Sequence, residues 1–141
     1  MPCIAYRDGY KYQLKQDYTL PNSGILPSAS IDTQFIKLDA SGELWIRAGY
    51  AWDGPSGPTI DTKNFMRGSL VHDALYQLMR EGHLDLTTHR DPADRLLQTL
   101  CLEDGMTQLR AWWVYEAVKR FGKPSASPSL DHPLIWAPKQ C

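Results

Sequence analysis

The clearest helical pattern in the chain is LVHDALYQLM, at residues 70–79. Its apolar residues recur in adjacent pairs four residues apart, an arrangement that places them on one stripe of an α-helix. Gly82 follows the last pair, and glycine is common just beyond a helix because it adopts positive φ without strain. We therefore expect a helix that ends near Gly82, with an apolar stripe made of Leu70, Val71, Ala74, Leu75, Leu78 and Met79.

Two more helices are expected in the second half of the chain. Asp91-Pro92 is typical of an N-cap followed by proline at the first helical position. The apolar stripe after it consists of Ala93, Leu96, Leu97, Leu100 and Cys101. A third helix is expected from about residue 106 to residue 121, with one apolar face at four-residue steps formed by Leu109, Trp113, Ala117 and Phe121. Its aromatic group is interpreted as core or as a surface for a partner helix: Trp112, Trp113 and Tyr115.

The first half of the chain shows the two-residue period of half-buried strands. Residues 10–14 alternate apolar and polar side chains, and Asp8-Gly9 before them is a type I′ hairpin signal. A second hairpin is expected over residues 34–50, and residues 21–27, with their prolines, should form an irregular connection. The expected fold class is α+β, with N-terminal antiparallel β-hairpins packed against a three-helix C-terminal half.

Length and composition limit the organisation and the partners. The 141 residues fit a single domain, placed at residues 1–122, followed by a Pro/Ser-rich extended arm at residues 123–141. The net charge of −1 argues against a nucleic-acid partner, and the longest apolar-rich run, residues 111–118, is too short to cross a bilayer. Three distant cysteines and a start without signal-peptide features favour a reducing, cytoplasmic location.

The helix at residues 70–79 also carries the candidate chemistry. His72 and Tyr76 share a face at the edge of the apolar stripe, whereas Asp73 lies further toward the outside. Asp94 flanks the next stripe, so antiparallel packing of the two helices would bring His72 and Asp94 together. A carboxylate that orients an imidazole is the arrangement of a general base. The alternative is a structural group: a hydrogen-bonded histidine, a carboxylate at a helix start and a core tyrosine.

A Gly/Pro-rich loop, WDGPSGP at residues 52–58, precedes this helix. Gly54 and Gly57 leave backbone carbonyls and amides open to a ligand, and Asp53 adds a carboxylate. The alternative is an ordinary turn with Asp53 as its cap. The other histidines lack the spacing of zinc ligands, and a metal phosphohydrolase would require a histidine earlier than His72.

The order of these motifs carries a resemblance. DGxSxP at residues 53–58, HDxLY at residues 72–76 and AD at residues 93–94 resemble a family of small uncharacterised phage and prophage proteins, a domain of unknown function. The resemblance extends over about residues 45–122 and implies a phage origin more than a reaction.

A more distant likeness is to calcium-dependent phospholipases A2, which have a Gly-rich calcium loop, a His-Asp-x-x-Tyr helix and a second helix whose Asp orients the His. The resemblance implies that His72 activates water and that Asp94 orients the His72 imidazole, with Tyr76 in the same catalytic group. It also implies a Ca²⁺ ion, held by Asp73, Asp53 and the backbone around Gly54 and Gly57. The chain departs from that family in lacking its disulfides and in placing prolines within the loop.

Three functions follow as alternatives. The first is a phage-derived accessory protein that hydrolyses esters or lipids with Ca²⁺ and a His-Asp pair. The second is a non-enzymatic virion or host-interaction protein, in which the same cluster is structural. The third is a hydrolase of cell-wall peptide or sugar, for which no specific motif is present. The expected location is the cytoplasm of an infected host cell, or the virion, and the sequence does not indicate an oligomeric state.

Overall fold

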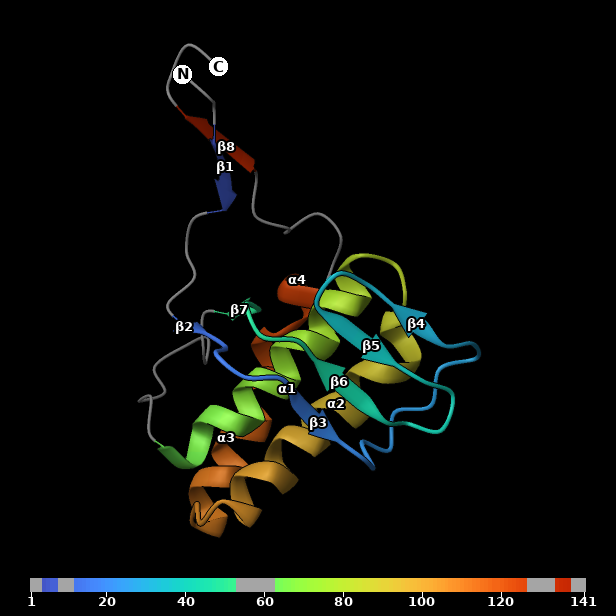
Figure 1. Cartoon of the computed structure of the whole chain (residues 1–141). Helices are drawn as coiled ribbons and strands as arrows, with labels where there is room; N and C mark the ends of the chain where they lie inside the picture. Colours follow the sequence, from blue (N-terminus) through green and yellow to red (C-terminus); the bar gives the residue numbers. More distant parts are fainter. Residues whose placement is uncertain (1–3, 8–11, 53–62, 127–133, 138–141) are drawn as a thin grey trace.

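The computed structural model describes residues 4–7, 12–52, 63–126 and 134–137. In chain order the elements are β1 (Ile4–Arg7), β2 (Tyr12–Gln13), β3 (Tyr18–Leu20), β4 (Ile31–Asp32), β5 (Ile36–Leu38), β6 (Leu44–Ile46), β7 (Ala51–Trp52), α1 (Lys63–Arg80), α2 (Leu86–Glu103), α3 (Gln108–Phe121), α4 (Lys123–Ala126) and β8 (Leu134–Ala137) (Figure 1). Strands fill the first part of the described chain and helices most of the second, so the fold class is α+β, as expected.

Four strands form the main antiparallel sheet, in the order β3-β6-β5-β4. The hairpin expected over residues 34–50 lies at its centre, because β5 pairs with β6 and Leu38 stands opposite Leu44. Alternate residues of a strand point to the same face, and here that face is fully buried. It carries Ile36, Leu38, Leu44 and Ile46, each 0% exposed. Residues 21–27 contain no strand, as their prolines predicted.

Two short pairings complete the strands of the described chain. β2 pairs antiparallel with β7, and β1 pairs antiparallel with β8, which lies beside it in Figure 1. The hairpin expected at Asp8-Gly9 is therefore wrong, because β1 and β2 pair with distant segments and not with each other. The Asp-Gly signal reports local turn preference only, whereas these pairings depend on contacts between remote parts of the chain.

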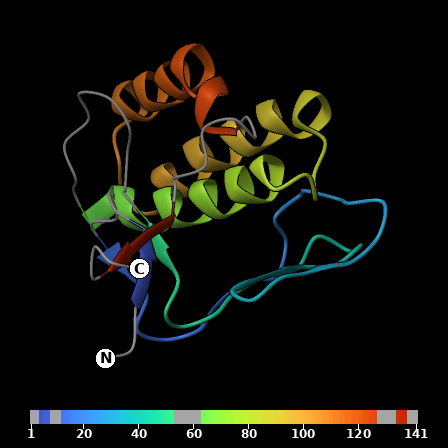
Figure 2. The ribbon, with the colours of Figure 1, turned by 90° about the horizontal axis from the view of Figure 1, so that it is seen from above.

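α1 and α2 pack against each other, and Figure 2 shows this helical layer beside the sheet. α1 ends where the glycine predicted. Gly82 has φ +82°, and its amide donates to the carbonyl of Met79 while the amide of His83 donates to Leu78. These two bonds satisfy carbonyls that a helix end leaves without partners. The chain then turns back, so that α2 runs antiparallel to α1.

Gly68 lies where α1 and α2 cross. A Cβ atom at this position would come within 2.9 Å of a Leu97 methyl carbon and 3.1 Å of the Cys101 sulfur. The absence of a side chain therefore allows the two helices to approach closely. This close approach fixes how far α1 is shifted along α2, and so which residues of the two helices face each other.

α2 starts earlier than predicted. It begins at Leu86, with Asp85 at the N-cap, where a carboxylate is favourable and accepts a hydrogen bond from the Thr88 hydroxyl. Asp91-Pro92, expected at the helix start, lies inside the helix. The prediction failed because a proline near the start of a helix removes one amide hydrogen bond without preventing helix formation when tertiary packing holds the segment.

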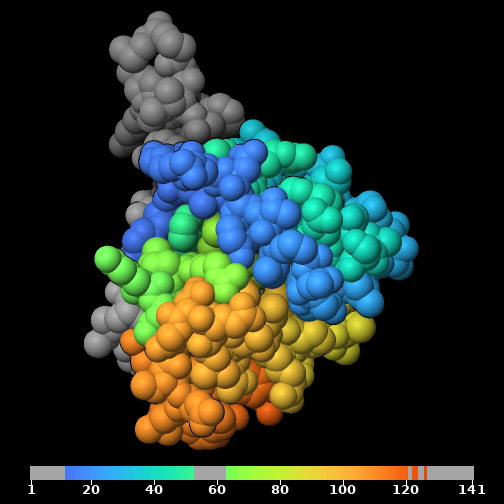
Figure 3. All heavy atoms as spheres, turned by 60° about the horizontal axis from the view of Figure 1, so that its bottom comes forward, coloured from blue at the N-terminus to red at the C-terminus, as the bar shows by residue number. Residues whose placement is uncertain are grey.

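The buried face of α3 also differs from the prediction. Leu109 and Trp113 were expected on the packed face, but they are 69% and 62% exposed, and Trp112 is 48% exposed. Steps of four residues drift around the helix by about 40° each, whereas the residues that are buried follow the 3.6-residue period. They are Ala111, Val114, Tyr115 and Val118. Figure 3 shows the end of α2 and the start of α3, in orange, at the end of the molecule remote from the cyan strands.

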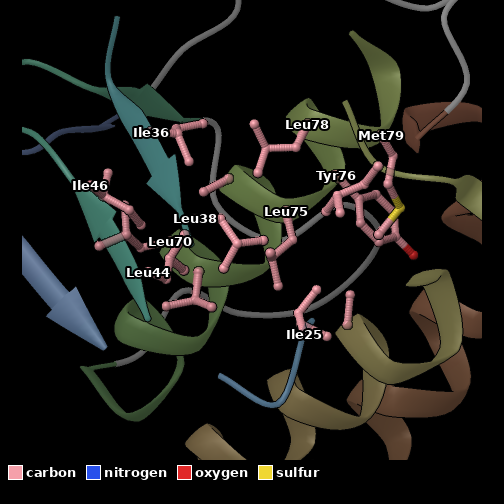
Figure 4. Close-up of a cluster of buried hydrophobic side chains, with 14 of the residues drawn as sticks. Ile25, Ile36, Leu38, Leu44, Ile46, Leu70, Leu75, Tyr76, Leu78 and Met79 are labelled. Carbon is pink, nitrogen blue, oxygen red and sulfur yellow. The ribbon is translucent and has the colours of Figure 1, made fainter. Parts of the chain in front are cut away.

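The main core lies between the sheet and α1. Figure 4 shows the side chains of Ile36, Leu38, Leu44 and Ile46 extending from the strands toward those of α1. All six stripe residues named from the sequence belong to this core, together with Tyr76. The α1 residues labelled in Figure 4 are Leu70, Leu75, Tyr76, Leu78 and Met79. Burial of this apolar area is the main favourable contribution to folding, and it fixes the rotation of α1 about its axis.

The segment after α3 differs at its start from the extended arm expected over residues 123–141. Residues 123–126 form α4, and Ala126 is fully buried in the main core. Pro124 stands in the first turn of this short helix, where a missing amide has no intrahelical partner to lose. Residues 134–137 form β8, so part of the remainder is paired with β1.

Candidate functional site

The seam between α1 and α2 brings together three polar side chains that the sequence singled out. His72 Nε2 lies 2.7 Å from Asp94 Oδ1, and the Tyr76 hydroxyl donates to the same oxygen at 2.5 Å. The His72 and Tyr76 rings are in contact, with centroids 4.0 Å apart. The stripes that pack α1 on α2 have polar edges, and the antiparallel arrangement makes those edges meet, as expected.

All three side chains of this cluster are buried. The exposed fraction is 6% for His72, 1% for Asp94 and 3% for Tyr76. A buried carboxylate is costly unless donors surround it, and Asp94 has two. The imidazole and the phenol therefore stabilise one fixed position of the carboxylate, and the carboxylate in turn fixes the imidazole ring.

The hydrogen bonds determine which nitrogen of His72 holds the proton. A carboxylate accepts hydrogen bonds only, so Nε2 carries the hydrogen that Asp94 receives. In the neutral imidazole Nδ1 then has the free lone pair. Nδ1 lies 3.9 Å from Asp73 Oδ1, which is too far for a direct hydrogen bond. His72 is thus held with its basic nitrogen directed toward the Asp73 side of the helix.

Burial and charge act in opposite directions on His72. Burial disfavours the imidazolium and lowers its pKa, but the carboxylates of Asp73 and Asp94 more than offset this, and the pKa of His72 is raised above its ordinary 6.5. Burial, together with the Asp94 carboxylate, also raises the pKa of the Tyr76 hydroxyl. Tyr76 therefore remains a hydrogen-bond donor at any physiological pH.

The proposed metal ligands are described only in part. Asp73 is the next residue after His72 on α1, and its side chain is 27% exposed. Asp53, Gly54 and Gly57 lie outside the described residues. Within the described ranges no group of three or more His, Cys, Asp and Glu side chains is placed to hold a metal ion. Asp73 supplies the kind of hard oxygen that Ca²⁺ prefers.

Trp52, the last described residue before the Gly/Pro-rich loop, is hydrogen-bonded to α1. Trp52, the last residue of β7, is 6% exposed, and its indole Nε1 donates to the Ser69 hydroxyl at 3.1 Å. Ser69 and Asp73 are four residues apart on α1, so they stand one turn apart on the same side of the helix. The bond therefore holds the end of β7 against α1, one turn before Asp73.

Sequence reasoning missed two residues of the site. Arg90 donates from Nη2 to the carbonyls of Val118 and Lys119 at the end of α3, and its charge acts to lower the pKa of Tyr76. Its Nε atom is buried and has no hydrogen-bond partner among the described residues. The early start of α2 is what places Arg90 here, so the error at Asp91-Pro92 concealed it.

Gly122 is the second missed residue. A Cβ atom here would lie 2.8 Å from the Tyr76 hydroxyl oxygen and 2.5 Å from the carbonyl oxygen of Val118. Gly122 stands at the C-cap of α3, with φ −82°. Any residue can adopt this φ, so the requirement for glycine here arises from the close approach of the Val118 carbonyl oxygen and of the Tyr76 side chain.

Comparisons with known protein families, with curated proteins and with solved structures find no match. No helix of the described chain is long and apolar enough to cross a membrane.

Proposed function

We propose that the protein is a phage-derived, Ca²⁺-dependent hydrolase of ester or lipid substrates, with His72 as the general base. The observation that carries the proposal is the shared acceptor, Asp94 Oδ1, which receives both His72 Nε2 at 2.7 Å and the Tyr76 hydroxyl at 2.5 Å. This arrangement holds the imidazole in the tautomer whose other nitrogen accepts a proton.

The chemistry of His72 follows from that tautomer. Nδ1 takes a proton from water as the water oxygen attacks the carbonyl carbon of an ester. The ester C–O bond to the alcohol then breaks, and the proton on Nδ1 passes to the leaving oxygen, which returns the imidazole to its neutral form. Asp94 stabilises the imidazolium that exists between these steps, and Tyr76 holds Asp94 in place.

The residues that would hold Ca²⁺ are Asp73 and, from the loop that follows Trp52 in the sequence, Asp53 and the backbone around Gly54 and Gly57. When bound, the ion would supply a Lewis acid that polarises the ester carbonyl. Asp73 is also one of the two carboxylates that raise the pKa of His72. Engagement of Asp73 by a cation would weaken that effect and bring the pKa of His72 closer to the range that suits a base at neutral pH.

The test is hydrolysis of phospholipid and simple ester substrates by the purified full-length protein, with and without a calcium chelator. His72→Gln is expected to lower turnover by about 10²–10⁴-fold, and Asp94→Asn by less. His83→Gln makes the same chemical change at a side chain that is 43% exposed and should leave turnover unchanged. Chelator-insensitive turnover, or none at all with well-folded protein, would overturn the proposal.

The depth of burial favours the second candidate, a non-enzymatic virion or host-interaction protein. Asp94 is 1% exposed and has both donors inside the fold, which is also the arrangement of a purely structural polar cluster. In that case the changes at His72 and Asp94 would each lower stability by about 1–3 kcal/mol, and Ca²⁺ would have no effect. A cytoplasmic or virion location fits either candidate.

A further inference from the structure

Large exposed apolar side chains gather at one corner of the described structure. Of the five such residues among the described ranges, four lie on the last turn of α2 and the first half of α3. These four, which we name the tryptophan patch, are Leu102, Leu109, Trp112 and Trp113. The corner is the orange region at the lower end of the face seen in Figure 3. The fifth residue, Leu26, belongs to a connection in the strand half of the chain.

Three of the four patch residues lie on α3. α3 packs on α2 and α4 and leaves its other side outward. The rings of Trp112 and Trp113 touch edge to face, with centroids 6.0 Å apart. Both are at least 48% exposed, although α3 already buries a complete apolar stripe against α2. Tryptophan combines a large apolar body with one N–H donor, which suits a boundary between water and an apolar medium.

The charges around the patch favour an anionic surface. Lys119 and Arg120, both exposed, continue the outward side of α3 toward its C-terminal end. The acidic side chains at the end of α2, Glu103 and Asp104, are each paired with Arg67 at 3.0 Å. One guanidinium therefore faces two carboxylates there, and on α3 itself Arg120 Nε lies 3.6 Å from Glu116 Oε2 in an exposed ion pair, a kind that contributes little. Lys119 and Arg120 still carry long cationic side chains that can extend to phosphate groups.

The apolar area of the patch distinguishes between a second protein copy and a bilayer surface as its binding partner. Two partly exposed tryptophans and two partly exposed leucines offer roughly 400 Å² of apolar area. A stable protein dimer buries about 800 Å² on each partner, which is roughly twice this area. A helix that lies in the headgroup region of a bilayer requires only an apolar side flanked by cations.

We propose that the tryptophan patch docks the protein on the surface of a phospholipid bilayer that contains anionic headgroups. Trp112, Trp113 and Leu109 enter the headgroup–acyl boundary, and Lys119 and Arg120 contact lipid phosphates. This docking goes beyond the proposed hydrolase and does not depend on it, because the patch and the His72 cluster share no residue.

The experiment is co-sedimentation with vesicles of equimolar phosphatidylglycerol and phosphatidylcholine, in chelator, so that no turnover is involved. The double change Trp112→Ala/Trp113→Ala is expected to weaken binding by about tenfold or more, because it removes both aromatic anchors. Leu26→Ala, at a residue 60% exposed in the strand half, should bind like the unaltered protein. Lys119→Gln/Arg120→Gln should weaken binding to these vesicles several-fold and have little effect on binding to pure phosphatidylcholine.

Several results would overturn this inference. Full-length protein that fails to sediment with either vesicle has no bilayer-docking surface. Equal binding by the Trp112→Ala/Trp113→Ala protein would place the contact elsewhere. Concentration-dependent self-association that the double change abolishes, without vesicle binding, would assign the patch to contact between copies. Circular dichroism of the double variant should match that of the unaltered protein, since both side chains point outward. Hydrolase activity enters none of these outcomes.

Discussion

The sharpest test of the buried cluster is Tyr76→Phe, which removes one oxygen atom and leaves the ring. The ring is 3% exposed and packs on His72, so the change creates almost no cavity. It does remove the donor that lies 2.5 Å from Asp94 Oδ1. Asp94 is 1% exposed, so water does not readily replace that donor. A hydrogen bond to a charged group contributes about 1.5–3 kcal/mol, and we expect the free energy of unfolding to fall by about 2 kcal/mol.

The chain contains a matched control for this change. The Tyr115 hydroxyl donates to Asp91 Oδ1 at 2.6 Å, which is nearly the same bond, but the Asp91 side chain is 52% exposed. Water can replace the donor there, so Tyr115→Phe should cost less than about 1 kcal/mol. Urea unfolding followed by circular dichroism measures both, and in a chain of this length 2 kcal/mol lowers the thermal midpoint by about 6 °C. Equal losses from the two changes would refute the argument that burial of the acceptor sets the magnitude.

Three further predictions concern the same site and its surroundings. The folded-state pKa of His72 is raised, so His72 should stabilise the metal-free protein fully below about pH 6.5 and lose that contribution as the pH rises through the raised pKa. The free energy of unfolding, measured in chelator, should therefore fall across this pH range, and His72→Gln should remove the pH dependence. Gly122→Ala should destabilise the protein by about 1–3 kcal/mol in urea unfolding, because the new methyl group meets the Val118 carbonyl oxygen and the Tyr76 hydroxyl. Deletion of residues 127–141 should change the thermal midpoint little, whereas deletion of residues 123–141 should lower it clearly, because Ala126 is fully buried.

Local signals in the sequence predicted much of the fold. The paired apolar residues of 70–79 and the glycine after them gave α1 and its end, and the alternation over residues 34–50 gave the central hairpin. These signals depend on the period of a single element, and burial of one face enforces that period. The pairing of β1 with β8 is different, because it joins remote segments and no local pattern encodes a remote partner.

The errors in the helical half have physical causes as well. Asp91-Pro92 has the composition of a helix start, but Asp85 and Thr88 provide an earlier one, and tertiary packing carries the helix through the proline. On α3, the apolar residues at four-residue steps predicted a buried face that includes Leu109 and Trp113. The helix instead buries the small residue Ala111 and the branched residues of its own stripe, which permits closer packing on α2.

The central pair of the site was predictable, but the groups around it were not. His72 and Asp94 stand at the edges of two stripes that must pack together, so their meeting follows from helical geometry alone. Tyr76 donates to the same carboxylate oxygen because the helices approach closely at Gly68, which sets the position of α1 along α2. Arg90 and Gly122 were missed because their roles arise from contacts between α2 or the end of α3 and the side of α1. The metal half of the site stays a prediction.

Calcium binding separates the hydrolase from the structural cluster most directly. Calorimetric titration of the full-length protein with Ca²⁺ should show binding at up to about millimolar concentration, together with a calcium-dependent rise in the thermal midpoint. Asp73→Asn should weaken this binding by tenfold or more, because it removes the charged oxygen ligand, while His72→Gln should leave it nearly unchanged. Absence of binding at millimolar Ca²⁺, with unfolding unaffected by the ion, would contradict the proposed function and identify the His72–Asp94–Tyr76 cluster as structural.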